Sequence, residues 1–406
     1  MKKKLNFMAT LSFLAISVFF ASPTQARPDV LCIYYPEWHV YPEGEEIFGK
    51  GRSEWDLVNT AKPFFPGHDQ PVQLLDGCLD DSDPAAVAKE IDYAVDSGID
   101  VFVYDWYWAD GHPIQHEALE RGFMKAPNRS RMKFALMWAN HDRSNAFRPA
   151  LGHSADKYWW KLKWTNEEFL EAIDYCIRTY FASPEYYRKD GKVFFSVYSA
   201  MRLIDRVGGP EKMKATLQAA QAKMKAAGLP PLHFSAMVHN VKDLPKAKAA
   251  GYDSASSYNV TPYDFDDNDV GREVGRGHKQ VLTHEEFAQC HRQYNTRIAK
   301  ASELPYIPTA TRGWDCTPRC RQDEPFPWAS LSYPYLGVVS GLKPEIFRGI
   351  LEDVRRQAEN DPLKPGAILI NAWNEYTEGC YLMPDKTSGR KYLDAVKAVF
   401  GKGQAR

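Results

Sequence analysis

The sequence predicts an α/β protein, a single (β/α)8 barrel of the TIM type whose long βα loops form a cleft. Three observations predict this fold. Eight short apolar runs recur along the 406-residue chain, amphipathic helical patterns lie between them, and the longest connections follow the apolar runs. Eight alternations of strand and helix are typical of a closed parallel barrel. The chain is long for one domain, but barrels with loop insertions reach this length.

The eight apolar runs are the predicted strands. They cover residues 30–35, 100–106, 133–138, 192–198, 232–238, 252–258, 306–311 and 367–373. Most are continuously apolar rather than alternating, which is typical of parallel strands buried on both faces. An open, doubly wound sheet is the alternative. It is less favoured because no glycine-rich phosphate-binding turn follows the first run.

Caps and apolar spacing predict the helices between the strands. A helix over 84–97 follows Asp83 and ends at Gly98. Capping boxes begin two others, one with Thr165 as the cap and one with Thr283. Two more amphipathic helices are predicted over 210–227 and 344–359, and shorter candidates follow residues 113, 242 and 388.

Four connections are much longer than the others. They cover residues 39–83, 141–164, 259–282 and 315–342. Each follows a strand and precedes a helix, so in a barrel all four lie on the face where active sites form. We therefore expect these loops to build a cleft over that end of the barrel.

Residues 1–26 are typical of a signal peptide. Three lysines at 2–4 precede an apolar stretch over 5–21, and small residues lead to a cleavage site after Ala26. The apolar stretch is short for a membrane span of about 20 residues. We therefore expect an exported protein, periplasmic or extracellular, with a catalytic barrel over 27–406 and no membrane span once the signal is removed.

Composition excludes several other function classes. The formal net charge is −1 and no basic stripe stands out, so we expect no nucleic-acid partner. No residue set predicts a metal site or a cofactor, and we expect neither. The seven cysteines include Cys316 and Cys320, which an oxidising compartment could join; the sequence leaves that pairing open, as it does the oligomeric state.

Polar and aromatic residues gather where five of the predicted strands end. A lone Trp or His at such a place is usually a packing residue, but five clusters would converge on one barrel mouth. We predict that they bind substrate, with Trp106, Trp108, Trp138 and Trp373 lining sugar subsites. The full set is Glu37, Trp38, His39, Asp105, Trp106, Trp108, Trp138, Asn140, His141, Arg312, Trp314, Trp373 and Asn374.

Glu375 and Glu378 are the predicted catalytic residues. Both follow the last strand, and glycosidic cleavage usually needs one carboxyl group to protonate the leaving oxygen and a second to support attack at the sugar. Neighbouring negative charge and aromatic walls would raise the pKa of one of them. The structural alternative is a helix start, where acidic residues face the positive end of the helix dipole.

Several segments together carry a family resemblance. They are residues 34–39 (Tyr-Tyr-Pro-Glu-Trp-His), 98–108, 138–140 (Trp-Ala-Asn) and 373–379 (Trp-Asn-Glu-Tyr-Thr-Glu-Gly). The last matches an Asn-Glu-aromatic-x-Glu-Gly motif. On these segments the sequence resembles the WbsX-like family, which is related to the endo-α-mannosidase-like enzymes of glycoside hydrolase family 99. The resemblance runs from the first strand to the eighth and implies a (β/α)8 barrel.

The resemblance also implies a mechanism. Family 99 enzymes are thought to cleave α-mannosidic linkages with retention, through the substrate's own 2-hydroxyl and a 1,2-anhydro sugar. By position, Glu375 would deprotonate the 2-hydroxyl and Glu378 would act as acid and then base. The family commonly has Trp where Tyr376 stands and tends to have Glu where Met383 stands, so the sugar specificity is left open.

Three function classes follow. An exported glycoside hydrolase acting on an oligo- or polysaccharide is favoured, because barrel, paired carboxyls and signal peptide agree. A glycosyltransferase of the WbsX type is the alternative, although nucleotide-sugar donors are cytoplasmic and no phosphate cradle is visible. A non-catalytic carbohydrate-binding barrel is the third, and it would have no need of both glutamates.

Overall fold

A parallel β-barrel forms the centre of the protein. The computed structural model describes residues 27–261, 280–327 and 333–401, so the predicted signal peptide over 1–26 lies outside the described residues. Parallel pairing follows the order β12-β10-β9-β8-β4-β2-β1-β15-β13. The strands are β1 (Asp29–Tyr34), β2 (Val101–Ala109), β4 (Lys133–Trp138), β8 (Lys192–Val197), β9 (Leu232–Met237), β10 (Ser254–Ser256), β12 (Tyr306–Ile307), β13 (Thr309–Thr311) and β15 (Ala367–Asn371).

The two end strands of this order, β12 and β13, are halves of one predicted strand over 306–311. Pro308 separates them, because proline has no N–H to donate to a ladder. β12 pairs with β10, and β13 pairs with β15, so together they close the barrel. The predicted (β/α)8 fold is therefore confirmed, and the open doubly wound sheet is not formed.

Helix α9 (His284–Ala301) supplies hydrogen bonds at the break in the seventh strand. Asn295 Oδ1 accepts from the Thr309 N–H at 3.1 Å, and its Nδ2 donates to the Thr309 carbonyl at 2.9 Å. His291 Nε2 accepts from the Thr311 N–H at 2.9 Å. Burial lowers the pKa of His291 to about 3, so its ring stays neutral and keeps this acceptor.

The barrel helices begin and end close to where the caps predict. Asp83 caps α3 (Pro84–Ser97), and Gly98 ends it in the left-handed conformation. The capping box at Thr283 is reciprocal. The cap at Thr165 is one-sided, because Glu168 accepts from the N–H groups of residues 163 and 164 instead. The others are α4 (Asn166–Thr179), α5 (Ala200–Arg206), α6 (Pro210–Ala226), α7 (Leu244–Ala249), α10 (Pro344–Asn360) and α11 (Lys391–Phe400).

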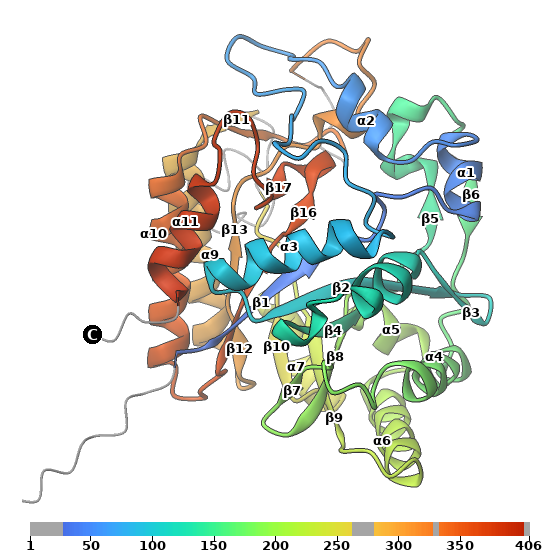
Figure 1. Cartoon of the computed structure of the whole chain (residues 1–406). Coiled ribbons are helices and arrows are strands. Elements are labelled where there is room, and N and C mark those ends of the chain that lie inside the picture. The colour runs from blue at the N-terminus through green and yellow to red at the C-terminus, as the bar shows by residue number, and fades with distance from the viewer. Residues whose placement is uncertain (1–26, 262–279, 328–332, 402–406) are drawn as a thin grey trace, which may run out of the picture.

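Short elements in the long loops cover one end of the barrel. They include α1 (Pro42–Phe48), α2 (Trp55–Thr60), the β5–β6 pair (Arg143–Ser144 and Tyr158–Trp160), the β11–β14 pair (Val281–Thr283 and Val338–Ser340) and the β16–β17 pair (Asn374–Glu375 and Cys380–Tyr381). In Figure 1 most of them lie in the upper part of the view, opposite α6. They follow strands, so they surround the carboxyl ends of the barrel.

The structure bears on three questions that the sequence raised: cysteine pairing, membrane-spanning helices and metal sites. All seven cysteines, Cys316 and Cys320 included, are free thiols in this structure. Among the described residues no helix is long and apolar enough to cross a bilayer. In the same ranges no group of three His, Cys, Asp or Glu side chains is arranged to hold a metal ion.

Candidate active site

A cavity of about 380 Å³ lies at the carboxyl ends of the barrel strands. Its lining is Tyr35, Asp105, Tyr107, Met137, Ala139, His141, Arg143, Phe147, Arg148, Tyr198, Ser199, Tyr258, Arg319, Tyr333, Glu375 and Glu378. Four predicted site residues are among them: Asp105, His141, Glu375 and Glu378. The two glutamates predicted to be catalytic therefore lie in the same cavity.

The tryptophans of β2 lie on the other side of the strand from this cavity. Asp105 and Tyr107 line the cavity, whereas Trp106 and Trp108 are buried against the ring of Tyr175 from α4. Successive side chains of a strand point to opposite faces. A tryptophan beside an inward-facing aspartate must therefore face the helices, and the predicted role of Trp106 and Trp108 in sugar subsites is corrected.

Trp138 and Trp373 are corrected in the same way. Trp138 is fully buried and packs against Phe169 of α4. Trp373 is also fully buried, packs against Phe102, and donates its indole N–H to Glu90 of α3 at 3.3 Å. Both rings lie between the barrel wall and the helices, so they stabilise the fold and do not line the cavity.

Trp138→Phe is expected to lower the free energy of unfolding by about 1–3 kcal/mol, because a smaller ring leaves a void in the core. Glycan affinity should stay unchanged, since this ring does not reach the cavity. Denaturant unfolding and calorimetric glycan binding measure the two effects. Tyr198→Ala, which removes a cavity ring, is the comparison and should weaken binding. Weaker binding in Trp138→Phe without loss of stability would contradict this placement.

Other predicted residues connect loops. Asn374 accepts from the Tyr35 N–H at 2.8 Å and donates to its carbonyl at 2.9 Å. Asn140 Oδ1 accepts from the Ser199 N–H at 2.7 Å. Neither asparagine lines the cavity, but each bonds the backbone of a residue that does, Tyr35 or Ser199, and so helps to hold that residue in place.

Arg312, Trp314 and Trp38 also lie away from the cavity. The Arg312 guanidinium carbon lies 4.1 Å from the ring of Tyr381 and 3.7 Å from that of Tyr392. Trp38 packs against three rings, those of Tyr35, Trp55 and Tyr376, and Trp314 is buried. None of these three side chains lines the cavity that holds the two glutamates, so their predicted contact with substrate is corrected for this cavity.

His39 is part of a buried ion cluster. Its Nδ1 lies 2.6 Å from Asp81 Oδ1, and its Nε2 lies 3.3 Å from Glu117 Oε2. Burial opposes protonation, but the charge and hydrogen bond of Asp81, aided by Glu117, raise the pKa of His39 to about 10. His39 is therefore a structural cation that joins the start of the connection between β1 and α3 to its end at Asp81 and to Glu117 in the segment after β2, and it is not a cavity residue.

Glu90 gives the fold a specific pH dependence. Burial raises the pKa of this α3 carboxyl to about 8, and the Tyr34 hydroxyl donates to it at 2.8 Å. In the unfolded chain its pKa is about 4.3. Between these two pH values the native protein holds a proton that the unfolded chain has released. The free energy of unfolding should therefore fall as the pH rises through this window.

Glu90→Gln is expected to flatten that decline, because glutamine accepts the same hydrogen bonds without titrating. Denaturant unfolding of both proteins at pH 5 and pH 7.5 measures the effect, and the difference between them isolates Glu90 from the other buried carboxyls. Parallel stability curves would show that Glu90 does not hold its proton in the native state.

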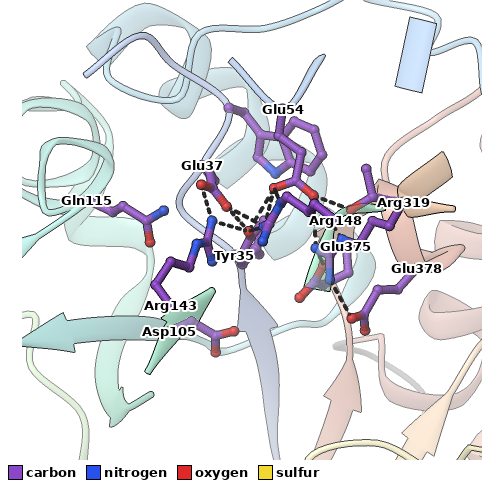
Figure 2. A network of polar contacts seen from close by, with 12 residues as sticks. Tyr35, Glu37, Glu54, Asp105, Gln115, Arg143, Arg148, Arg319, Glu375 and Glu378 are labelled. Atoms are coloured by element: carbon purple, nitrogen blue, oxygen red, sulfur yellow. Dashed lines mark hydrogen bonds and ion pairs between the residues drawn. The ribbon is translucent and has the colours of Figure 1, made fainter. Parts of the chain in front are cut away.

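Arg319, in the loop after β13, contacts both predicted catalytic carboxyls. Its Nη1 donates to Glu378 Oε1 at 2.7 Å, and its Nη2 lies 3.4 Å from Glu375 Oε2 and 2.9 Å from Glu54 Oε1. The Tyr333 hydroxyl adds a bond to Glu378 Oε1 at 2.8 Å. In Figure 2 the contacts of Arg319 run to Glu54 and to the glutamate pair. One buried guanidinium thus holds the two carboxyls near each other.

Two further arginines are held from behind the cavity by buried glutamates. Arg143 pairs with Glu37, and Arg148 Nη2 lies 2.8 Å from Glu37 Oε2 and 2.6 Å from Glu54 Oε2. Burial raises the pKa of Glu37. Burial also opposes ionisation of Glu54, but the charges of Arg148 and Arg319 outweigh it and hold the pKa of Glu54 well below its usual range. Glu37 therefore acts on the cavity through Arg143 and Arg148.

Asp105 and Glu375 share one tyrosine. The Tyr258 hydroxyl lies 2.8 Å from Asp105 Oδ2 and 2.9 Å from Glu375 Oε1. Burial raises the pKa of both carboxyls well above the usual range. For Glu375, the negative charge of Glu378 raises the pKa further. His141 differs, since burial and the neighbouring arginines lower its pKa to about 4 and leave it neutral near pH 7.

The two glutamates stand on a tight turn. β16 and β17 pair antiparallel across one 3-10 turn, Tyr376–Glu378, so the segment is a hairpin and not the start of a helix. Gly379 ends the turn at φ 70°, and a Cβ there would lie 2.9 Å from Asp315. The Asp315 N–H donates to the Glu378 carbonyl at 2.7 Å. The motif glycine is required because the chain passes the neighbouring loop too closely for a side chain.

Most of the other cavity residues were not predicted from sequence. Tyr198 and Tyr258 are the last residues of two predicted strands, and this position at the carboxyl end of the barrel could have indicated that they line the cavity. Arg143 and Arg148 in the loop after β4, and Arg319 in the loop after β13, had no local signal. Their importance comes from buried carboxyl partners far away in the chain, such as Glu54.

Comparison with known proteins identifies the family. The model of the family described as Glycosyltransferase WbsX matches residues 30–396. The chain belongs to this WbsX family. Two curated relatives, both uncharacterized proteins named WxcX from strains of Xanthomonas campestris pv. campestris, are 25% identical over 391 residues. The match covers 93% of this chain and 50% of each relative, so the chain spans about half their length.

Solved structures share the fold. The GH99 endo-α-mannosidase of Bacteroides thetaiotaomicron superposes with a TM-score of 0.57 at 15% identity, covering 91% of this chain and 95% of that chain. A glycoside hydrolase-like protein superposes with a TM-score of 0.58 at 14% identity, covering 94% and 98%. At these identities the likeness shows the barrel fold, as the resemblance implied.

Proposed function

We propose that this chain is a glycan-processing enzyme that hydrolyses glycosidic bonds in an oligo- or polysaccharide. The observation that carries the proposal is that Glu375 and Glu378 line one cavity in unlike surroundings. Glu375 shares a tyrosine with a second carboxyl, whereas Glu378 is paired with Arg319. Two carboxyl groups with different environments are what acid–base cleavage of a glycosidic bond requires.

We assign the roles of Glu375 and Glu378 from their positions in the Asn-Glu-aromatic-x-Glu-Gly motif and from the carboxylate oxygen that the described residues leave without a hydrogen bond. Glu375 accepts the proton of the substrate's 2-hydroxyl, which then attacks the anomeric carbon. Glu378 protonates the leaving oxygen and afterwards activates water, so the anomeric configuration is retained. Glu378 Oε1 is occupied by Arg319 and Tyr333, but its Oε2 has no hydrogen-bond partner among the described residues. That oxygen is the one we assign to the leaving group.

The substrate class rests on likeness. The structural neighbour from Bacteroides thetaiotaomicron is an endo-α-mannosidase, and an α-mannoside-like linkage is therefore the first choice for this site. The tyrosines of the cavity, among them Tyr107 and Tyr198, supply flat apolar faces with hydroxyl edges, which suit sugar rings.

Glycosyl transfer is the second candidate, because the family model is described as a glycosyltransferase. The same two carboxyls would then act on an activated sugar donor, and an acceptor hydroxyl would take the place of water. The predicted signal peptide supports the hydrolase, since nucleotide-sugar donors are cytoplasmic. We propose export with cleavage after Ala26, which amino-terminal sequencing of the mature protein tests.

Product release from a panel of α- and β-linked glycans tests the function. Hydrolysis of one linkage class supports a hydrolase. If NMR shows that the sugar is first released with the anomeric configuration of the substrate, the retaining mechanism is supported. Release of the inverted anomer contradicts the mechanism. Product formation only when a nucleotide-activated sugar and an acceptor are both present supports the transferase. Binding without any conversion in either assay supports a carbohydrate-binding barrel.

A further inference from the structure

Tyr258 lies between two carboxyl groups but has only one hydrogen to donate. Its hydroxyl is 2.8 Å from Asp105 Oδ2 and 2.9 Å from Glu375 Oε1, and all three residues are buried. Both distances are those of hydrogen bonds. The phenol can donate to one carboxylate only, so the second contact needs a carboxyl O–H that donates to the phenol oxygen. The geometry therefore requires one proton on the Asp105 and Glu375 pair.

The surroundings place this proton on Asp105. Among the residues that the structure describes, the buried Asp105 Oδ1 has no hydrogen-bond partner, and no lysine or arginine forms an ion pair with Asp105. Glu375 Oε2, in contrast, lies 3.4 Å from the Arg319 guanidinium. A nearby cation stabilises a carboxylate, whereas burial without a cation favours the neutral acid.

We propose that Asp105 carries a proton in the working enzyme and, through Tyr258, keeps Glu375 ionised and oriented as the base. Asp105–OH donates to the phenol oxygen, and the phenol O–H donates to Glu375. Asp105 and Tyr258 are thus positioning residues for Glu375. This inference rests on the proposed function, because it assigns Glu375 the role of accepting a proton from substrate.

Other charged groups around the pair act on both carboxyls. Glu378 and Arg319 act electrostatically on both Asp105 and Glu375, and Glu54 acts on Glu375 as well. The charges of Asp105 and Glu375 both raise the pKa of the Tyr107 hydroxyl. Glu378 opposes ionisation of either carboxyl, whereas Arg319 favours it. Glu378 and Arg319 act on both members of the pair, and Glu54 opposes ionisation of Glu375 alone, so it is the direct contact of Arg319 with Glu375 that favours the charge on Glu375.

Asp105→Asn is the informative variant. Its amide N–H can donate to the phenol oxygen as the protonated acid does, but it cannot ionise. We expect most of the activity to survive at neutral pH, and the alkaline limb of the pH profile to move to higher pH. Asp105→Ala, which lacks the donor, should lose activity that Asn retains. Loss of activity in a folded Asp105→Asn protein, at the level of Asp105→Ala, would show that the working form is the carboxylate and overturn the proposal.

Tyr258→Phe tests the second link. Without the phenol, Glu375 loses the donor that favours its charge, so the acidic limb of the profile should move to higher pH. Tyr252→Phe is the matched control. It removes a buried hydroxyl that has no hydrogen-bond partner in the described part of the chain, six residues earlier in the same segment. Its profile should equal that of the native protein. An unshifted acidic limb in Tyr258→Phe contradicts the assignment.

Infrared spectroscopy tests the proton without any substrate. At neutral pH the native protein should show the C=O stretch of a protonated carboxyl that is missing in Asp105→Asn, while the contribution of Glu90 cancels in the difference spectrum. An unchanged band overturns the proposal even if the protein hydrolyses glycans. A lost band supports it even if every glycan of the panel is left uncut, so failure of the proposed function and failure of this inference are distinguishable.

Discussion

Replacing Glu378 by glutamine is expected to lower the rate of glycoside hydrolysis by about 10²–10⁴-fold, the usual contribution of a general acid or base. Arg319 and Tyr333 can still donate to the amide oxygen, so the site should keep its shape. The amide cannot protonate a leaving oxygen, and kcat should fall while glycan affinity survives. Steady-state kinetics and calorimetric binding measure the two quantities.

The leaving group provides an internal check on this prediction. An aryl glycoside with an acidic phenol needs little protonation, so its first step should depend much less on Glu378 than that of a natural glycan. Glu345→Gln, on the exposed start of α10, is the control and should change neither quantity. Undiminished turnover of the natural glycan by Glu378→Gln would remove Glu378 from the mechanism.

Arg319→Met is expected to cost about 3–5 kcal/mol of unfolding free energy, the cost of leaving buried charge without its partner. Arg319 is buried and contacts Glu54, Glu375 and Glu378, so its loss leaves three carboxyls with one cation fewer. Acid should reduce the loss, because protonated carboxyls no longer need the cation. Denaturant unfolding at pH 5 and pH 7.5 measures both the loss and its pH dependence.

Arg321 offers a matched control two residues away. It is exposed and pairs with Asp323 at the surface, where ion pairs contribute little. Arg321→Met should therefore leave stability nearly unchanged. Equal losses in the two variants would show that the effect comes from the loop and not from the buried carboxyls.

The fold could be predicted because its signals are local. Buried parallel strands are continuous apolar runs, and caps such as Asp83, Thr165 and Thr283 mark helix starts within a few residues. The strand over 306–311 was predicted whole, although Pro308 divides it. The sheet still closes there, since each half pairs with a different neighbour.

The site could be predicted only in part, because proximity along the chain does not decide which way a side chain points. Trp106 and Asp105 are adjacent, yet only Asp105 faces the cavity. The alternation of a strand contains this information once one inward residue is known. Arg319 and Glu54 could not have been paired from sequence, because 265 residues separate them and their contact exists only in the folded protein.

The hydrogen bonds that α9 gives to the seventh strand set a limit on redesigning this barrel. An exchanged helix with the same length and apolar pattern would fill the same space. Without Asn295 and His291 it would leave the Thr309 and Thr311 amides without acceptors inside the wall. Grafting experiments on this scaffold must therefore treat α9 and the strand over 306–311 as one transferable unit.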